Sequence, residues 1–308
     1  MNSEPPKDFD RLREAFQQRF ESLSPHLKRI ARHALADPNR LALQTVVEVA
    51  EETGVQPSTL IRFAKVFGFS GFSEMQSVFR LRLIEGAPSY RDEIYRHRNK
   101  LEEAAKDDPS AILKEYADAS ALAVSQLKDD IDDDALRRAV RMMDSANAVY
   151  VIGQRRAFPV AAYLAYGLTR LEYRCHLLDS VGGMLPQQAA MLGKDDLLIG
   201  VSFAEYSQPV VDVVGDAHIR KVPVLAITDS LASPLAPRSS VCFVVRDTEV
   251  HRFRPLAAPV VLAQSLIIAL GYYRDARNVG GSCDDNKIDG YIPDPAWPQS
   301  SNFKTQPS

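Results

Sequence analysis

The sequence has little cysteine and no long apolar run. Its three cysteines, Cys175, Cys242 and Cys283, lie far apart and are odd in number, which argues against a disulfide framework and against a zinc site. No apolar run approaches the roughly 20 residues that a membrane span needs. The opening MNSEPPKDFD carries acids and prolines and lacks the apolar segment of a secretory signal. We therefore expect a protein of the reducing cytoplasm that contacts no membrane and holds no metal and no cofactor.

The length and the distribution of charge indicate two domains with different tasks. The 308 residues exceed the roughly 250 at which a single hydrophobic core stops growing. Residues 1–100 hold 16 Lys and Arg against 13 Asp and Glu, which leaves 21 against 27 in the remainder. A mildly basic first part and an acidic second part fit a DNA-binding domain followed by a domain with another function. Ordinary surface variation is the alternative for so small an imbalance.

The first part of the chain has the apolar spacing of helices. From Phe9 to about Leu83 apolar residues recur every three or four positions, with breaks at Ser24-Pro25, at Asp37-Pro38 and at Gly54. We predict an all-α domain over residues 9–85. A charged stretch follows, and we assign residues 86–128 to a helical linker.

Short apolar runs alternate with helical segments in the second part. The runs cover residues 148–152, 176–178, 197–201, 224–227 and 241–245. Such alternation is typical of parallel strands joined by crossover helices, so residues 129–274 predict a doubly wound α/β domain with a parallel sheet. Residues 275–308 are rich in Gly, Ser, Asp, Asn and Pro and predict a disordered polar tail.

The segment VVEVAEETGVQPSTLIRFAKVFGF has the pattern of a helix-turn-helix. Ala50 is small enough to let the second helix cross the first closely, and Gly54 tolerates the positive φ of the turn. Pro57 suits the first position of the second helix. Four apolar residues have the spacing that points them into the angle between the helices: Val49, Val55, Leu60 and Phe63.

The polar positions of the second helix then face outward. A recognition helix uses short hydrogen-bonding groups at its N-terminal end on base edges, and its cations on bases or phosphates. The predicted DNA contacts are Gln56, Ser58, Thr59, Arg62 and Lys65. A plain three-helix packing unit with a polar outer face is the alternative for the motif taken alone.

The stretch from Leu23 to Phe79 resembles the N-terminal domain of the MurR/RpiR family of transcriptional regulators. The likeness rests on four features: Leu23-Ser24-Pro25, Asp37-Pro38, Arg62-Phe63 and Gly68-Phe69-Ser70-Gly71-Phe72. The resemblance implies that the second domain is a sugar isomerase (SIS) fold, a flavodoxin-like sheet that binds phosphorylated sugars. The segments VYVIGQRRAF, LLIGVSFAEYS and AITDSLASPLA are similar to that fold.

The phosphate-binding loops of that family are altered here. A phosphate sits where strands end and helices begin, held by loop N–H groups and hydroxyls. The family places Gly and Ser in the first loop and Ser-x-Ser-Gly-x-Thr in a later one, whereas this sequence has GQRRAF and SFAEYS. The candidate ligand residues are Gly153, Gln154, Arg155, Arg156, Ser202, Glu205 and Ser207, with Ser180 from a third loop.

Two interpretations of these loops remain open. In one, Arg155 and Arg156 replace the lost donors and bind an anion through bidentate hydrogen bonds, while Glu205 pairs with an arginine or selects a cationic or hydroxyl-rich ligand. In the other, the site has decayed and the domain only dimerises. We favour the first, because charged groups at strand ends are costly to keep without partners.

We therefore expect a DNA-binding transcriptional regulator, a homodimer or homotetramer, whose second domain senses a small anionic metabolite such as a phosphorylated sugar. Operator DNA is the other expected partner. A ligand-independent DNA-binding dimer is one alternative. The other is a sugar-phosphate isomerase, whose base would come from Glu205, His176, His218, Glu249 or His251. None of these five has a spacing that marks catalysis, so we predict no enzyme activity.

Overall fold

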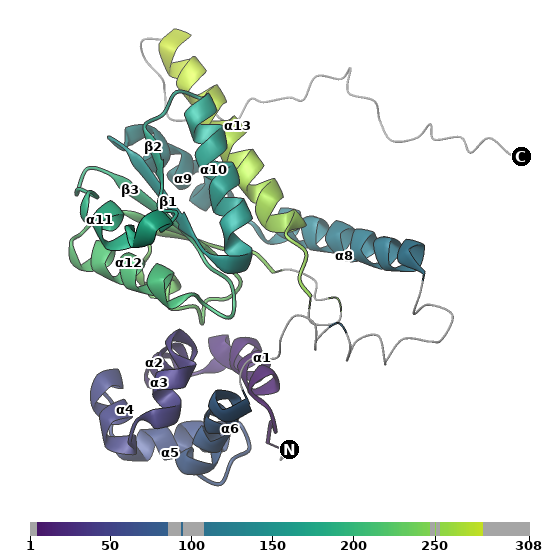
Figure 1. The fold of residues 1–308 in the computed structure, drawn as a ribbon, viewed down its shortest axis with the longest axis vertical. Coiled ribbons are helices and arrows are strands. Elements are labelled where there is room, and N and C mark those ends of the chain that lie inside the picture. Colours follow the sequence, from purple (N-terminus) through teal and green to yellow (C-terminus); the bar gives the residue numbers. More distant parts are fainter. Residues whose placement is uncertain (1–4, 86–93, 95–107, 247–249, 251–252, 280–308) are drawn as a thin grey trace, which may run out of the picture.

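The computed structural model describes residues 5–85, 108–246 and 253–279, with the single positions 94 and 250. Figure 1 shows the described residues as two units, a helical head and an α/β unit above it. Residues 86–93 and 95–107 of the expected linker and 280–308 of the expected tail, together with Glu249 and His251, lie outside the described residues.

Six α-helices build the described head. They are α1 (Phe9–Arg19), α2 (Pro25–Ala36), α3 (Pro38–Leu43), α4 (Val46–Thr53), α5 (Pro57–Val66) and α6 (Phe72–Glu85). Three of them begin with the proline that the sequence marks as a start, because a first-turn residue needs no backbone donor. Asp37 ends α2 and caps α3, since its carboxylate accepts from the Arg40 N–H at 2.9 Å.

An aromatic cluster joins the first helix of the head to the fifth. The ring of Phe16 lies 5.2 Å from that of Phe63 and 4.7 Å from that of Phe67, and the latter two are 5.1 Å apart. These separations and the tilted planes are those that aromatic pairs prefer. The cluster fixes α5 in the head, so that its opposite side is left for solvent.

The second unit is a doubly wound α/β domain, as predicted. Its five described strands are β1 (Val149–Gly153), β2 (Cys175–Leu177), β3 (Leu197–Val201), β4 (Val224–Thr228) and β5 (Val241–Val244). All pairings are parallel, in the order β2-β1-β3-β4-β5. The order reverses between β1 and β3, and this is the point at which ligands bind in open α/β sheets.

Helices cover both faces of the sheet (Figure 1). They are α8 (Pro109–Asp130), α9 (Asp133–Ser145), α10 (Phe158–Arg170), α11 (Leu185–Ala190), α12 (Gln208–Ile219) and α13 (Ala257–Val279). Alternate residues of β1 enter two different cores. Tyr150 packs into the core that contains α12, and Val151 into the one that contains α10 and α13.

Two helices at the boundaries of this unit extend further than the sequence indicates. The sequence boundary assigns α8 to the linker, but its Ala123 is buried in the core with α13. Within the described residues α13 has the length and hydropathy of a membrane span. Its inward side, including Leu262 and Leu266, packs fully buried in that same core.

The head and the α/β unit share a core. One cluster of buried apolar side chains includes Phe9 and Leu35 of the head and Tyr206 and Val210 of the α/β unit. The Arg32 guanidinium of α2 also donates to the Leu231 carbonyl, 3.3 Å away. The head therefore packs against the sheet side that α12 covers.

A glycine substitution tests the turn of the helix-turn-helix. Gly54 has φ +60°, whereas Gly71 is outside the left-handed region and has no atom within 4 Å of an added Cβ. We expect Gly54→Ala to lower the free energy of unfolding by about 1 kcal/mol, because a side chain is strained at that φ. Gly71→Ala is the control and should leave stability nearly unchanged. Equal melting temperatures for the two variants would contradict the assignment.

Candidate functional site

Two parts of the structure carry candidate chemistry: the outer side of α5 and the loops at the carboxyl ends of the strands. The first is shaped by the helix-turn-helix. Val49, Leu60 and Phe63 are fully buried in the angle between α4 and α5 as predicted, and Ala50 is 3% exposed. The turn between the helices holds Gly54 in the left-handed region.

A capping box forms the N-terminus of α4, and an arginine side chain hydrogen-bonds to the turn that follows the helix. The Thr45 N–H donates to the Glu48 carboxylate, and the Glu48 N–H donates to the Thr45 hydroxyl. These hydrogen bonds hold the pKa of Glu48 below its ordinary value. Arg29 of α2 donates to the Gly54 carbonyl at 3.1 Å. These contacts help to fix the orientation of α5 relative to α4 and α2.

The outer side of α5 is exposed and has unused hydrogen-bonding groups. Within the described residues, four of the five predicted contacts are exposed and their side chains have no partner: Gln56, Ser58, Arg62 and Lys65. Thr59 is half-buried. A groove of about 630 Å³ runs along α4 and α5, lined in part by Gln56, Thr59 and Arg62. In Figure 1, α5 lies on the side of the head that faces away from the α/β unit.

Sequence reasoning missed one residue of this face. Ile61 is 44% exposed and lies three residues after Ser58 and four before Lys65, on the same side of the helix. An exposed apolar side chain between hydrogen-bonding groups can contact a thymine methyl group. Its spacing from Ser58 is the signal that could have identified it.

The second candidate region lies where β1 and β3 end side by side. Gln154 connects three loops, because it donates to the Ser180 hydroxyl at 3.0 Å and accepts from the Ser207 hydroxyl at 2.7 Å. Ser202 and Ser207 are buried, 2% and 3% exposed. The structure therefore brings together the predicted polar residues of all three loops. An added Cβ at Gly153 would lie 2.9 Å from the Ala157 carbonyl, so close packing against α10 explains this glycine.

The two adjacent arginines of the first loop differ in their surroundings. Arg156 is half-buried, stacks 4.7 Å over the Phe203 ring and donates to the Arg254 carbonyl at 3.1 Å. Arg155 is exposed, has φ +53°, and has no partner within the described residues. Of the predicted pair, Arg155 is thus the one whose guanidinium faces an open space, while Arg156 packs inside the α/β unit.

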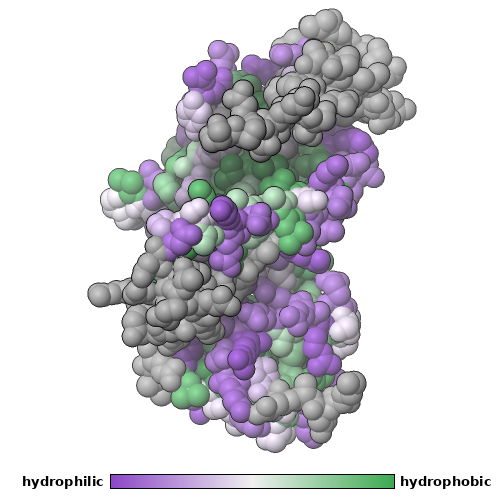
Figure 2. All heavy atoms as spheres, turned by 90° about the vertical axis from the view of Figure 1, so that its right-hand side faces the viewer, coloured by the Kyte–Doolittle hydropathy of each residue, from purple (hydrophilic) through white to green (hydrophobic). Residues whose placement is uncertain are grey.

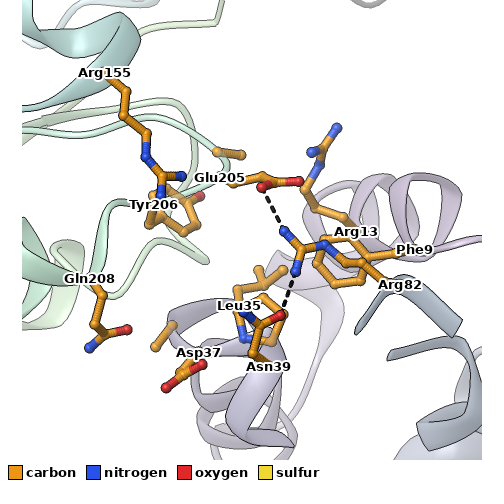
Figure 3. Close-up of a pocket in the computed structure, with 13 residues that line it drawn as sticks. Phe9, Arg13, Leu35, Asp37, Asn39, Arg82, Arg155, Glu205, Tyr206 and Gln208 are labelled. Carbon is orange, nitrogen blue, oxygen red and sulfur yellow. Dashed lines mark hydrogen bonds and ion pairs between the residues drawn. The ribbon is translucent and has the colours of Figure 1, made fainter. Parts of the chain in front are cut away.

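Glu205 pairs with an arginine, as one interpretation expected, but the arginine comes from the head. Its carboxylate accepts from Arg82 of α6 at 2.6 Å. Figure 3 shows this contact in a cavity of about 130 Å³ between the two units, with Arg155 on the opposite wall. No sequence signal predicts Arg82 at this site, because it precedes Glu205 by 123 residues.

Asp229 holds the loop that carries Glu205. Its carboxylate accepts from the Ala204 N–H at 3.0 Å and from the Tyr206 hydroxyl at 2.9 Å, and it forms an ion pair with Arg254 at 3.3 Å. Burial, together with the Asp229 charge, raises the pKa of Tyr206 well above its ordinary value. The loop is therefore anchored on a carboxylate from the end of β4.

The three candidate isomerase bases that lie within the described residues have separate surroundings. Glu205 is engaged with Arg82, His176 lies against the Tyr150 ring, and His218 contacts the Arg238 carbonyl. Among the described residues no group of three or more His, Cys, Asp or Glu is arranged to hold a metal ion.

Two family models match the chain. A helix-turn-helix domain of the rpiR family matches residues 11–85, and the SIS domain matches residues 142–270. An HTH-type transcriptional regulator of Haemophilus influenzae is 25% identical over 218 residues, 70% of this chain and 73% of the relative. The bifunctional protein glk of Paraburkholderia xenovorans is 25% identical over 79% of this chain, which spans only 36% of that relative.

Solved structures agree with this fold. The sugar isomerase domain of the RpiR transcription factor from Sphaerobacter thermophilus has a TM-score of 0.51 and 26% identity, over 54% of this chain and 92% of that one. The Vibrio vulnificus NanR protein, solved with ManNAc-6P, has a TM-score of 0.51 and 20% identity, over 87% of this chain and 94% of that one. Fold and site together define a helix-turn-helix head joined to a SIS domain. The chain belongs to the RpiR family of HTH-type transcriptional regulators.

A substitution of Asp229 tests the anchor of the loop that carries Glu205. We expect Asp229→Ala to lower the free energy of unfolding by about 3 kcal/mol, because the ion pair with the largely buried Arg254 and the hydrogen bonds to Ala204 and Tyr206 would be lost. Asp212→Ala, on the exposed side of the nearby α12, is the matched control and should change stability little. Urea denaturation of both variants measures the difference, and equal stabilities would refute the anchor.

Proposed function

We propose that the chain is a regulator that binds operator DNA through α5 and whose SIS domain senses a small anionic metabolite. The proposal of DNA binding rests on the properties of the outer side of α5. Its donors and acceptors are exposed, lack partners within the described residues and face away from the α/β unit. A recognition helix needs this combination to enter the major groove.

The ligand half is supported by the loops at the reversal of strand order. A phosphate or carboxylate would bind Arg155, and hydroxyl groups of the ligand would contact the chain formed by Ser180, Gln154 and Ser207. We infer that the effector is of the sugar-phosphate class, as is the ManNAc-6P bound in the structure of the Vibrio vulnificus protein. The altered loops then differ from the family pattern because an arginine side chain supplies the donors.

We further propose that the protein acts in the cytoplasm as a homo-oligomer, at least a dimer, since one helix-turn-helix supplies few base contacts. Apolar side chains are exposed on two helices of the α/β unit: Ile112, Leu113 and Leu122 on α8, and Val261, Ile268 and Tyr272 on α13. Figure 2 shows apolar surface on the upper unit, on the face turned to the viewer. A second copy of the chain would bury this surface.

Replacement of Arg62 tests the DNA half. Arg62→Ala should weaken binding to a duplex that the wild-type protein selects from random sequences by about 1–3 kcal/mol if the guanidinium contacts a base. Fluorescence anisotropy at fixed ionic strength measures the affinity. Arg11→Ala, which removes an exposed arginine of α1, is the control and should bind as the wild type does. An unchanged affinity in the Arg62 variant would rule out this contact.

Replacement of Arg155 tests the ligand half. We expect sugar phosphates from a panel to raise the melting temperature of the wild-type protein and to change its operator affinity. Arg155→Gln should lose this response and keep its DNA binding, whereas Arg246→Gln, another exposed arginine of the same unit, should respond normally. A panel without effect would favour the ligand-independent dimer, and turnover of a sugar phosphate would favour the isomerase.

A further inference from the structure

Charged side chains of both units line the cavity between the head and the α/β unit. Arg155 and Glu205 line it from the strand-end loops, and Arg82 and Asp37 line it from the head. In the view of Figure 3, Glu205 lies between Arg155 and Arg82. Arg13 of α1 lines the cavity as well, so cationic groups of both units surround this carboxylate.

Arg82 is held firmly in position. One terminal nitrogen of its guanidinium donates to the Glu205 carboxylate at 2.6 Å and the other to the Asn39 amide oxygen at 2.9 Å. The guanidinium also stacks 4.6 Å over the Phe9 ring, and the side chain is only 14% exposed. An arginine fixed by its own domain and directed at a loop of the other domain is a preorganised anion-binding group.

Glu205 is the anion that this arginine holds in the structure. Its side chain is 30% exposed, and it stands in the loop where the family pattern has small hydroxyl residues and glycine. The described cavity, at about 130 Å³, is smaller than the roughly 300 Å³ at which ligand pockets begin. A sugar phosphate could enter only if the lining of the cavity rearranged, and the Arg82–Glu205 ion pair is a contact of that lining which joins the two units.

We propose that Arg82 of the head is part of the effector site, and that the effector's anionic group replaces Glu205 as its partner. The anion then bridges Arg82 and Arg155, while Glu205 and Asp37 accept hydrogen bonds from the effector's hydroxyl groups. This inference rests on the proposed ligand function and adds the head to it. Because the effector contacts both units, its binding energy depends on where the head lies, which is the condition for linkage between the two sites.

The two members of the pair should have opposite effects on anion binding. Arg82→Gln removes a donor to the anion and should weaken binding of inorganic phosphate by about tenfold or more. Glu205→Gln removes the competing carboxylate and should strengthen it. If the pair only held the two units together, both variants would shift phosphate affinity in the same direction.

The experiment uses the full-length chain, with inorganic phosphate and glucose 6-phosphate as probes and titration calorimetry as the measurement. Arg40→Gln and Glu52→Gln break another ion pair of the head, outside the cavity, and are the matched controls. Both controls should bind the probes as the wild type does, and circular dichroism verifies that every variant is folded.

Each result has one consequence. Weaker phosphate binding by the Arg82 variant, tighter binding by the Glu205 variant and unchanged controls support the proposal. If Arg155→Gln weakens binding and Arg82→Gln does not, the effector site lies in the α/β unit alone, and only the role of the head is overturned. If neither probe binds the wild-type chain, both this inference and the proposed ligand binding are contradicted. The proposed DNA binding is then tested separately by the Arg62 variant.

Discussion

The burial of the parallel sheet on both faces determines where chemistry can occur in the α/β unit. Every residue of β1, β3 and β4 is buried, so polar groups along the strands would have no water and few partners. Polar residues are therefore confined to the strand ends, where Gln154, Ser180 and Ser207 hydrogen-bond to one another across three loops. The head contacts the unit at one of these strand-end loops, where Arg82 binds Glu205.

The elements that the sequence predicted well depend on local spacing. Ala50, Gly54, Leu60 and Phe63 fall within one 14-residue stretch, and a helix-turn-helix is defined by contacts of that range. The strands were found for a similar reason, since fully buried parallel strands read as short apolar runs. Ile61 was missed because an apolar residue on a helix is normally assigned to the core, although its place in the helical repeat puts it beside Ser58.

What the sequence could not predict depends on long-range packing. The partner of Glu205 lies 123 residues earlier in the chain, and no local pattern links the two. Nor does the sequence distinguish the neighbours Arg155 and Arg156. The fold does so, because Arg155 is exposed in it while Arg156 stacks on Phe203 inside the unit. The packing of α8 on α13 could not be predicted either, since the sequence of an amphipathic helix does not indicate which surface the helix packs against.

A regulator of this kind has to convert the binding of a small molecule into a change in the placement of α5. A ligand shifts an equilibrium only by its difference in affinity for the two states. An effector held by the SIS loops alone would have the same contacts wherever the head lay, and so would have no such difference. Glu205 changes this, because it joins the ligand loop to Arg82, and Arg82 is fixed to Asn39 and Phe9 of the head. On the proposed mechanism, an anion that competes with Glu205 would alter an ion pair between the two units and, through it, the placement of α5.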